Sequence, residues 1–329
     1  AIRVMVPLTA SEEIVDEAIA TGCDIIITHH PIIFGGLKKL NGKNYVERTV
    51  IKAIKNDIAL YAIHTNLDNY RNGVNAEIAD KIGLKNTRVL QPKKNVLSKL
   101  VFYVPIENKP EVLDAVFKAG AGEIGNYSSC SFSSDGEGTF LPEEGANPAI
   151  GELNKLERVS ESRVEVLMSN HLSGKILQAL FEAHPYEEVA HEIISISNVN
   201  KFEGSGMIGT LEVPEPSEKF LQRMKATFQC DAIRHTKIHK KEVQTVAVCG
   251  GAGSFLVNTA KAQKADVYLT GDMKYHEFFD AEDEIIIADI GHYESEQYTS
   301  VLLANILTKK FPKFALRLTE KNTNPINYI

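Results

Sequence analysis

The stretch Asp-Ile-Ile-Ile-Thr-His-His-Pro at residues 24–31 decides the fold. Its three consecutive isoleucines form an apolar run without alternation, which is typical of a strand covered on both faces in a sheet flanked by helices. Two histidines follow directly, at the expected carboxyl end of that strand. Open α/β sheets place their ligand crevice at this edge, so one stretch predicts both the fold and a candidate site.

Outward from this strand, β-branched runs alternate with amphipathic runs. Thr9 and Glu12 form a capping box, which predicts a helix that ends at Ala20. Strands are expected at residues 2–8, 58–63, 245–249, 266–269, 285–289 and 314–318, and helices at 46–56, 75–82, 255–262, 273–279 and 293–307. This pattern predicts an α/β protein whose two ends form one discontinuous core with a mostly parallel sheet.

The middle of the chain has a different rhythm. Strands are expected at 100–104, 127–132, 163–168 and 189–195, with helices at 109–119 and 173–183. Two β-α-β units in tandem are the ferredoxin-like pattern. We therefore predict an inserted ferredoxin-like α+β domain at residues 97–203, within a core domain formed by residues 1–96 and 204–329.

Composition limits the classes of function. The 329 residues are 43% hydrophobic and 24% charged, with a net charge of −7 that disfavours nonspecific binding to nucleic acid or anionic membrane. No apolar run approaches the roughly 18 to 20 residues of a membrane span, and the first residues lack a signal-peptide layout, so a cytoplasmic protein is expected. The four cysteines are far apart, which leaves histidine and carboxylate as the expected metal ligands.

The first candidate cluster is His29 and His30. Side chains alternate along a strand, so two adjacent histidines do not easily bind one ion while the strand stays regular. The pair can instead serve two neighbouring ions, or one imidazole can bind and the other support it. The alternative is one hydrogen-bonded core histidine and one surface histidine.

Two further clusters follow later strands. Asp68 is a candidate ligand or an Asx-turn residue, and His64 can orient a ligand through a hydrogen bond. His292 and Glu296 are four residues apart at a helix start, where they share one face and can reach a common ion. The alternative for a carboxylate there is a favourable interaction with the helix dipole.

All three clusters are predicted at carboxyl ends of strands, and this convergence carries the site prediction. Three imidazoles and two carboxylates exceed the needs of one four-coordinate zinc ion and suit two ions that share a carboxylate. The proposed ligand set is His29, His30, Asp68, His292 and Glu296.

Glycine-rich segments offer a second type of site. The run Gly250, Gly251, Gly253 and Ser254 lies between a strand and a helix, where backbone N–H groups can meet a phosphate. A tight turn explains the run equally well, because the Lys-Ser/Thr of a P-loop is missing. Asp272 is a candidate proton-transfer or substrate-contacting group, with a helix cap as its alternative.

These motifs resemble the Nif-three-like family, also described as type-two GTP cyclohydrolase I-like or dinuclear metal centre proteins. The resemblance rests on four segments, at residues 26–34, 64–68, 270–272 and 291–296, and on His-Pro-Tyr-Glu-Glu at 184–188, which is typical of a CutA/PII-like inserted domain.

The resemblance implies metal ligands at His29, His30, Asp68, His292 and Glu296, with Glu296 bridging, and a ring-shaped homo-hexamer. Members usually begin with a further helix and loop, whereas this sequence opens almost at Ile2.

The sequence therefore supports two hypotheses about function. The first is a hydrolase with two divalent ions, zinc first and iron or manganese as alternatives, that acts on a GTP-like nucleotide or another phosphorylated small molecule. His64 and Asp272 are its candidate catalytic groups, and Gly250 to Ser254 its candidate phosphate site. The second is a non-catalytic metal-binding ring that acts as a scaffold or regulator. Binding to nucleic acid is the least favoured, because of the negative charge.

Overall fold

The computed structural model describes residues 2–329, and the chain has the expected α/β fold class. It divides into two compact units, here called the core unit, up to Pro92 and from Lys201 to Ile329, and the inserted unit, Lys93–Asn200. These limits lie slightly before the sequence-based domain boundaries at 96/97 and 203/204.

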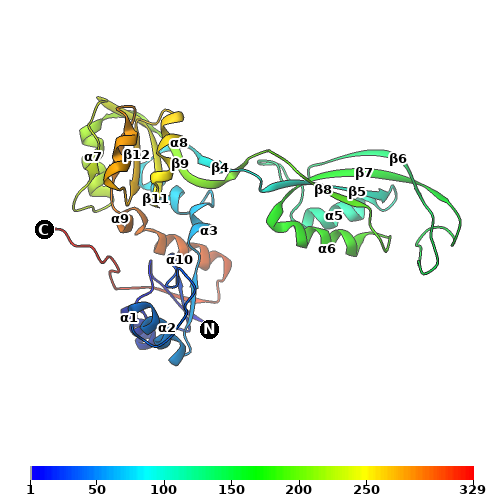
Figure 1. The fold of residues 1–329 in the computed structure, drawn as a ribbon, viewed down its shortest axis with the longest axis horizontal. Helices are drawn as coiled ribbons and strands as arrows, with labels where there is room; N and C mark the ends of the chain where they lie inside the picture. Colours follow the sequence, from blue (N-terminus) through cyan, green and yellow to red (C-terminus); the bar gives the residue numbers. More distant parts are fainter. Residues whose placement is uncertain (1) are drawn as a thin grey trace. The chain divides into compact units, whose positions relative to one another are not determined.

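The core unit contains a parallel four-stranded sheet in the order β14-β1-β2-β3. Its strands are β1 (Arg3–Val6), β2 (Ile25–Thr28), β3 (Ala59–Ala62) and β14 (Ala315–Leu318). Helices α1 (Glu12–Thr21) and α2 (Tyr45–Lys55) lie side by side (Figure 1) and bury an apolar face with strands β1 and β2. Ser11 caps α1, because its side chain accepts the Ile14 N–H.

A second sheet of the core unit has six strands in the order β10-β13-β12-β11-β9-β4. They are β4 (Lys85–Lys93), β9 (Asn200–Pro216), β10 (Arg234–His235), β11 (Glu242–Ala252), β12 (Val267–Gly271) and β13 (Ile286–Asp289). Strands β11, β12 and β13 are parallel, whereas β9 runs antiparallel to β11 and β10 runs antiparallel to β13. The expected single sheet is therefore wrong in this detail: the core has two sheets, and the second is mixed.

The core unit has further helices besides α1 and α2. They are α3 (Thr65–Asp68), α4 (Val74–Ile82), α7 (Ser217–Thr227), α8 (Val257–Ala262), α9 (His292–Glu296) and α10 (Thr299–Lys310), with 3-10 turns η2 (Ser254–Leu256) and η3 (Tyr275–Ala281). Helix α4 packs on β11, and α10 packs on α4 and β1. One apolar cluster includes Val6 and Ile27 of the first sheet and Val248 and Leu269 of the second. The two sheets therefore share one core.

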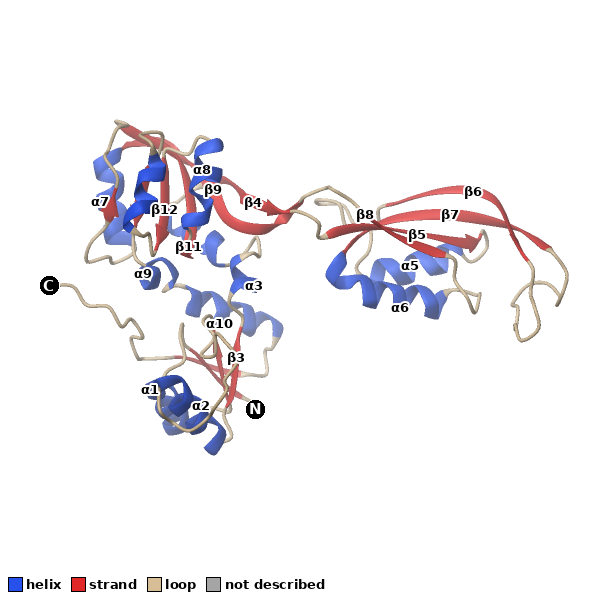
Figure 2. Cartoon of the chain, viewed as in Figure 1, coloured by secondary structure: helices blue, strands red, loops and turns tan. Residues whose placement is uncertain are grey.

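The inserted unit has one antiparallel sheet in the order β6-β7-β5-β8. Its elements are β5 (Leu97–Pro105), α5 (Lys109–Ala119), β6 (Ser131–Phe140), β7 (Glu157–Ser169), the 3-10 turn η1 (Asn170–Leu172), α6 (Ser173–Ala183) and β8 (His191–Ser195). Helices α5 and α6 cover one face of this sheet, as Figure 2 shows, and enclose their own apolar cluster. The order of strands and helices is that of a ferredoxin-like unit.

Two local expectations are corrected. The helix expected at 293–307 is broken after Glu296, so the histidine and carboxylate of that segment sit on the separate short helix α9. The glycines at 250 and 251 lie within β11 rather than in a loop. Among residues 2–329, no helix has the length and apolarity to cross a membrane.

Candidate metal centre

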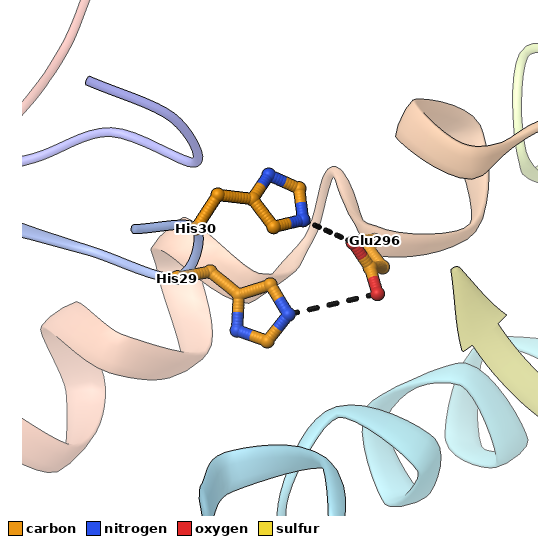
Figure 3. A group of neighbouring side chains, drawn as sticks. All are labelled: His29, His30 and Glu296. Carbon is orange, nitrogen blue, oxygen red and sulfur yellow. Dashed lines mark hydrogen bonds and ion pairs between the residues drawn. The ribbon is translucent and has the colours of Figure 1, made fainter. Parts of the chain in front are cut away.

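The two adjacent histidines lie just beyond the end of β2. The N–H groups of His29 and His30 both donate to the Leu8 carbonyl, at 3.1 and 3.0 Å, and the Thr28 hydroxyl donates to the His30 carbonyl at 2.7 Å. The backbone therefore turns away from strand geometry here, and the alternation of side chains does not apply. Both imidazole rings point toward Glu296 in Figure 3.

Glu296 lies on α9 and is only 3% exposed. Its Oε2 atom is 2.8 Å from His30 Nε2, and its Oε1 atom is 3.6 Å from His29 Nε2. The candidate ligand atoms of these three residues lie within 4.8 Å of one another. One carboxylate oxygen thus faces each histidine, which is the arrangement that a bridging carboxylate requires.

The other two proposed ligands are Asp68, which lies beside His29, and His292, which lies beside His30. Asp68 Oδ1 is 3.3 Å from His29 Nε2. His292 Nε2 is 3.2 Å from both Glu296 Oε2 and His30 Nε2. Five residues from three distant segments therefore direct nitrogen and oxygen atoms at one small volume.

Hydrogen bonds fix the orientation of two of the rings. His30 Nδ1 is 2.8 Å from the Thr9 hydroxyl, and His292 Nδ1 is 2.7 Å from Asp272 Oδ2. When Nδ1 carries the proton in these bonds, the Nε2 lone pair faces the centre and is free to bind a cation.

The carboxyl groups of Asp68 and Glu296 differ in pKa. Burial raises the pKa of Asp68 to about 6, against the opposing effect of His29. Burial also tends to raise the pKa of Glu296, but hydrogen bonds with the surrounding histidines hold it well below its ordinary value. The bond to Glu296 raises the pKa of His292 to about 9. Glu296 therefore favours its ionised form more strongly than Asp68 does.

Buried polar atoms that lack a hydrogen-bond partner indicate whether a cation fits this cluster. Within the described residues, both ring nitrogens of His29 and the Oδ1 of Asp68 are buried without a hydrogen bond. His29 is fully buried, and leaving such atoms unsatisfied costs about 1 to 3 kcal/mol each. A divalent cation would supply the missing partner for His29 Nε2 and Asp68 Oδ1, so the residues fit a metal ion.

His64 lies beside this cluster rather than within it. Its ring centroid is 5.6 Å from that of His29 and 6.0 Å from that of His30. Its backbone has a φ of +43°, which a non-glycine residue rarely adopts, and its N–H donates to the His29 carbonyl at 2.8 Å. Burial lowers the pKa of His64, so its ring is neutral near pH 7.

The glycines at 250 and 251 lie against the centre. Their N–H groups already donate, Gly250 to Asn75 Oδ1 at 3.0 Å and Gly251 to Ser295 Oγ at 2.9 Å. A Cβ atom on Gly251 would lie 2.6 Å from Glu296 Oε1. These two glycines make room for the bridging carboxylate and do not present free N–H groups to a phosphate.

Gly253 and Ser254, the other half of the glycine-rich segment, lie outside β11. Gly253 precedes η2, and its carbonyl accepts the Tyr268 hydroxyl at 2.7 Å. Anion binding by Gly253 and Ser254 stays a prediction.

The sequence reasoning missed three supporting residues: Thr9, Asn75 and Ser295. Thr9 was assigned to a helix cap, yet it follows β1 at the same sheet edge as His29 and His30, and that position was the available signal. Asn75 and Ser295 hold the two glycine N–H groups, and their pairing with residues far away in the sequence has no local signal.

The fold and this cluster define an α/β protein with a candidate metal site of histidine and carboxylate ligands. The chain belongs to the Duf34/NIF3 (NGG1p interacting factor 3) family, whose model matches residues 1–325. The expected family is thereby confirmed.

Curated relatives carry the name GTP cyclohydrolase 1 type 2 homolog. The Bacillus subtilis protein is 39% identical over 333 residues, covering 99% of this chain and 89% of its own length. The Halalkalibacterium halodurans protein is 41% identical over 292 residues, covering 88% and 78%. Among solved structures, a Bacillus cereus protein related to NIF3 aligns with a TM-score of 0.85 and 38% identity, over 100% of this chain and 89% of that one.

Proposed function

We propose that this protein is a metal-dependent hydrolase that holds two divalent ions. The observation that carries the proposal is the shared carboxylate: the two oxygens of Glu296 face different histidines, 2.8 Å from His30 and 3.6 Å from His29. A carboxylate in this position can bridge two ions.

Each oxygen of Glu296 defines one half of the proposed site. His29 and Asp68 would hold one ion together with Oε1, and His30 and His292 would hold the other together with Oε2. Imidazole and carboxylate ligands suit zinc, with iron and manganese as alternatives.

Bound divalent ions lower the pKa of coordinated water and so supply a hydroxide nucleophile near neutral pH. The chain's own residues would prepare this chemistry. Asp272 holds the imidazole of His292 through Nδ1, and neutral His64 can accept a proton beside His29 and His30.

A GTP-like nucleotide is the proposed substrate class, and it rests on the name of the curated relatives. Gly253 and Ser254 are the remaining candidates for contact with its phosphates. A cytoplasmic location and a homo-hexamer belong to the same proposal. The exposed aromatic side chains of Tyr275 and Phe279, 71% and 65% exposed, support burial against another copy.

Elemental analysis and turnover together test the proposal. Purified protein loaded with zinc, iron or manganese is assayed for metal content and for hydrolysis of GTP and simple phosphoesters. We expect two ions per chain in the wild type, and the loss of one ion and of turnover in His292→Ala. Hydrolysis that survives complete metal removal would refute a metal-dependent reaction. Metal-loaded protein without any turnover would favour the non-catalytic scaffold.

A further inference from the structure

Asp289 is a buried carboxylate at the end of β13, beside the proposed metal centre but outside its ligand set. It is 4% exposed. Its Oδ2 accepts the Met273 N–H at 3.0 Å, and its Oδ1 accepts the Gly291 N–H at 2.9 Å. Arg234 pairs with Oδ2 and donates a second hydrogen bond to the Met273 carbonyl at 2.9 Å.

The two N–H groups belong to the segments that carry Asp272 and His292. Met273 directly follows Asp272, and Gly291 directly precedes His292. The carboxylate of Asp272 then meets His292 Nδ1 at 2.7 Å, which closes a ring of contacts through Asp289. One buried side chain thus connects both backbones behind this hydrogen bond.

The backbone at these segments needs such support. Asp272 has a φ of +55° and Gly291 a φ of +90°, and the first value is unfavourable for a residue with a side chain. Asp272 is itself exposed, so packing around its side chain does not fix it. The hydrogen bonds of Asp289 hold the neighbouring peptide groups instead.

We propose that Asp289, braced by Arg234, is a positioning residue that sets His292 for one of the two ions. This inference rests on the proposed function, because it assumes that His30, His292 and Glu296 Oε2 form one half of the centre. Asp289 bonds the peptide groups beside Asp272 and His292, which belong to the half that contains His292. Its loss should therefore weaken the binding of one ion and leave unchanged the binding of the ion held by His29 and Asp68.

A carboxylate is required because both oxygens accept. In Asp289→Asn only one acceptor oxygen remains, and the amide NH₂ faces a second donor, so one of the two backbone bonds is lost. Removing a group that orients a metal ligand typically weakens metal affinity 10-fold to 100-fold.

The chain offers a matched control in Asp266. Its Oδ2 accepts two backbone N–H groups, from Gln244 at 2.9 Å and Thr245 at 2.8 Å, and its Oδ1 pairs with Lys240 at 2.7 Å. Like Asp289 it accepts two backbone N–H groups and pairs with a cation, but both N–H groups bond the same oxygen, and it precedes β12, whereas Asp272 follows that strand. Asp266→Asn thus removes the carboxylate charge and its ion pair with Lys240 without reaching His292.

The test measures zinc binding to the full chain by equilibrium dialysis, with metal-free protein as the starting state. We expect Asp289→Asn to bind one ion with wild-type affinity and the other about 10-fold to 100-fold more weakly. Asp266→Asn should keep both affinities. Equal binding by wild type and Asp289→Asn overturns the inference, as does equal weakening of both ions. Absence of zinc binding by the wild type instead refutes the proposed function.

A second readout needs no metal. Hydrogen exchange of the metal-free protein should show faster exchange in Asp289→Asn at whichever of the Met273 and Gly291 amides loses its acceptor, with no change there in Asp266→Asn. Unchanged exchange at both amides contradicts the role of Asp289.

If Asp289→Asn does not fold, Arg234→Gln decides the question. Arg234 is 59% exposed in its side chain, so this change leaves the core intact. Arg234→Gln should weaken the binding of the same single ion. Unchanged zinc affinity would overturn the inference.

Discussion

Replacing Asp68 by asparagine should stabilise the metal-free protein while it weakens metal binding. The side chain of Asp68 is 23% exposed, and its Oδ1 has no hydrogen bond within the described residues. Burial raises the pKa of this carboxyl to about 6 from an ordinary 3.8. The folded, metal-free protein therefore resists the ionised form that a metal ion requires.

The size of the expected stabilisation follows from this shift in pKa. The difference between 3.8 and about 6 corresponds to about 3 kcal/mol. Because the folded state binds the proton more tightly than the unfolded chain, stability falls as the pH rises from about 4 to about 6, and the cost is constant above that range. Asparagine is neutral at every pH, so Asp68→Asn should gain up to about 3 kcal/mol at pH 7.5 and only about 1 kcal/mol at pH 4.5.

Calorimetry in the presence of a chelator measures the effect. For the core unit, about 3 kcal/mol corresponds to a rise in Tm of roughly 6 to 12 °C at pH 7.5. Added zinc should reverse the order, because it stabilises the wild type and binds the variant weakly. Asp16→Asn is the control, since Asp16 is 59% exposed and should not raise the Tm. A metal-free Asp68→Asn protein that is no more stable than the wild type at pH 7.5 would refute the reasoning.

Three further changes test separate parts of the centre. Glu296→Gln removes the shared carboxylate and should abolish binding of both ions by elemental analysis, whereas Glu294→Gln, a buried neighbour that bonds Asn324, should leave metal content unchanged. Gly251→Ala places a Cβ 2.6 Å from Glu296 Oε1 at a φ of +63°, so we expect a loss of about 1 to 3 kcal/mol in unfolding free energy and weaker zinc binding. Gly36→Ala is its control, because the described structure has no atom within 4 Å of the added Cβ. Thr9→Val removes the partner of His30 Nδ1 and should weaken zinc about 10-fold to 100-fold in dialysis, and an unchanged affinity would exclude this orienting role.

The sequence predicted the elements well where local signals are strong. The apolar run before His29 became β2, and the helices expected at 109–119 and 173–183 have those same bounds. The break between α9 and α10 was missed, because residues 293–307 keep a helical composition and no proline or glycine marks the change.

Other features depend on contacts between distant segments. The division of the core into two sheets is decided by pairing, such as that of β1 with β14, which local patterns do not reveal. The structure places the five proposed ligands together, but the partners of Gly250 and Gly251 show why a glycine-rich turn alone cannot predict an anion site. Strand and helix signals are local, whereas hydrogen-bond partners are set by the assembled fold.

The pairing of β1 with β14 also bears on how the chain folds during synthesis. Arg3 pairs with Ala315, so β1 has only one of its two neighbours, β2, until β14 has been synthesised. The sheet of the inserted unit, by contrast, pairs only strands within that unit, and shorter sequence separation favours faster folding. The inserted unit should fold first. The apolar strands around His29 and His30 cannot complete their packing until α9 and β14 have been synthesised. Chaperone binding to nascent chains should therefore concentrate on the first sheet of the core unit.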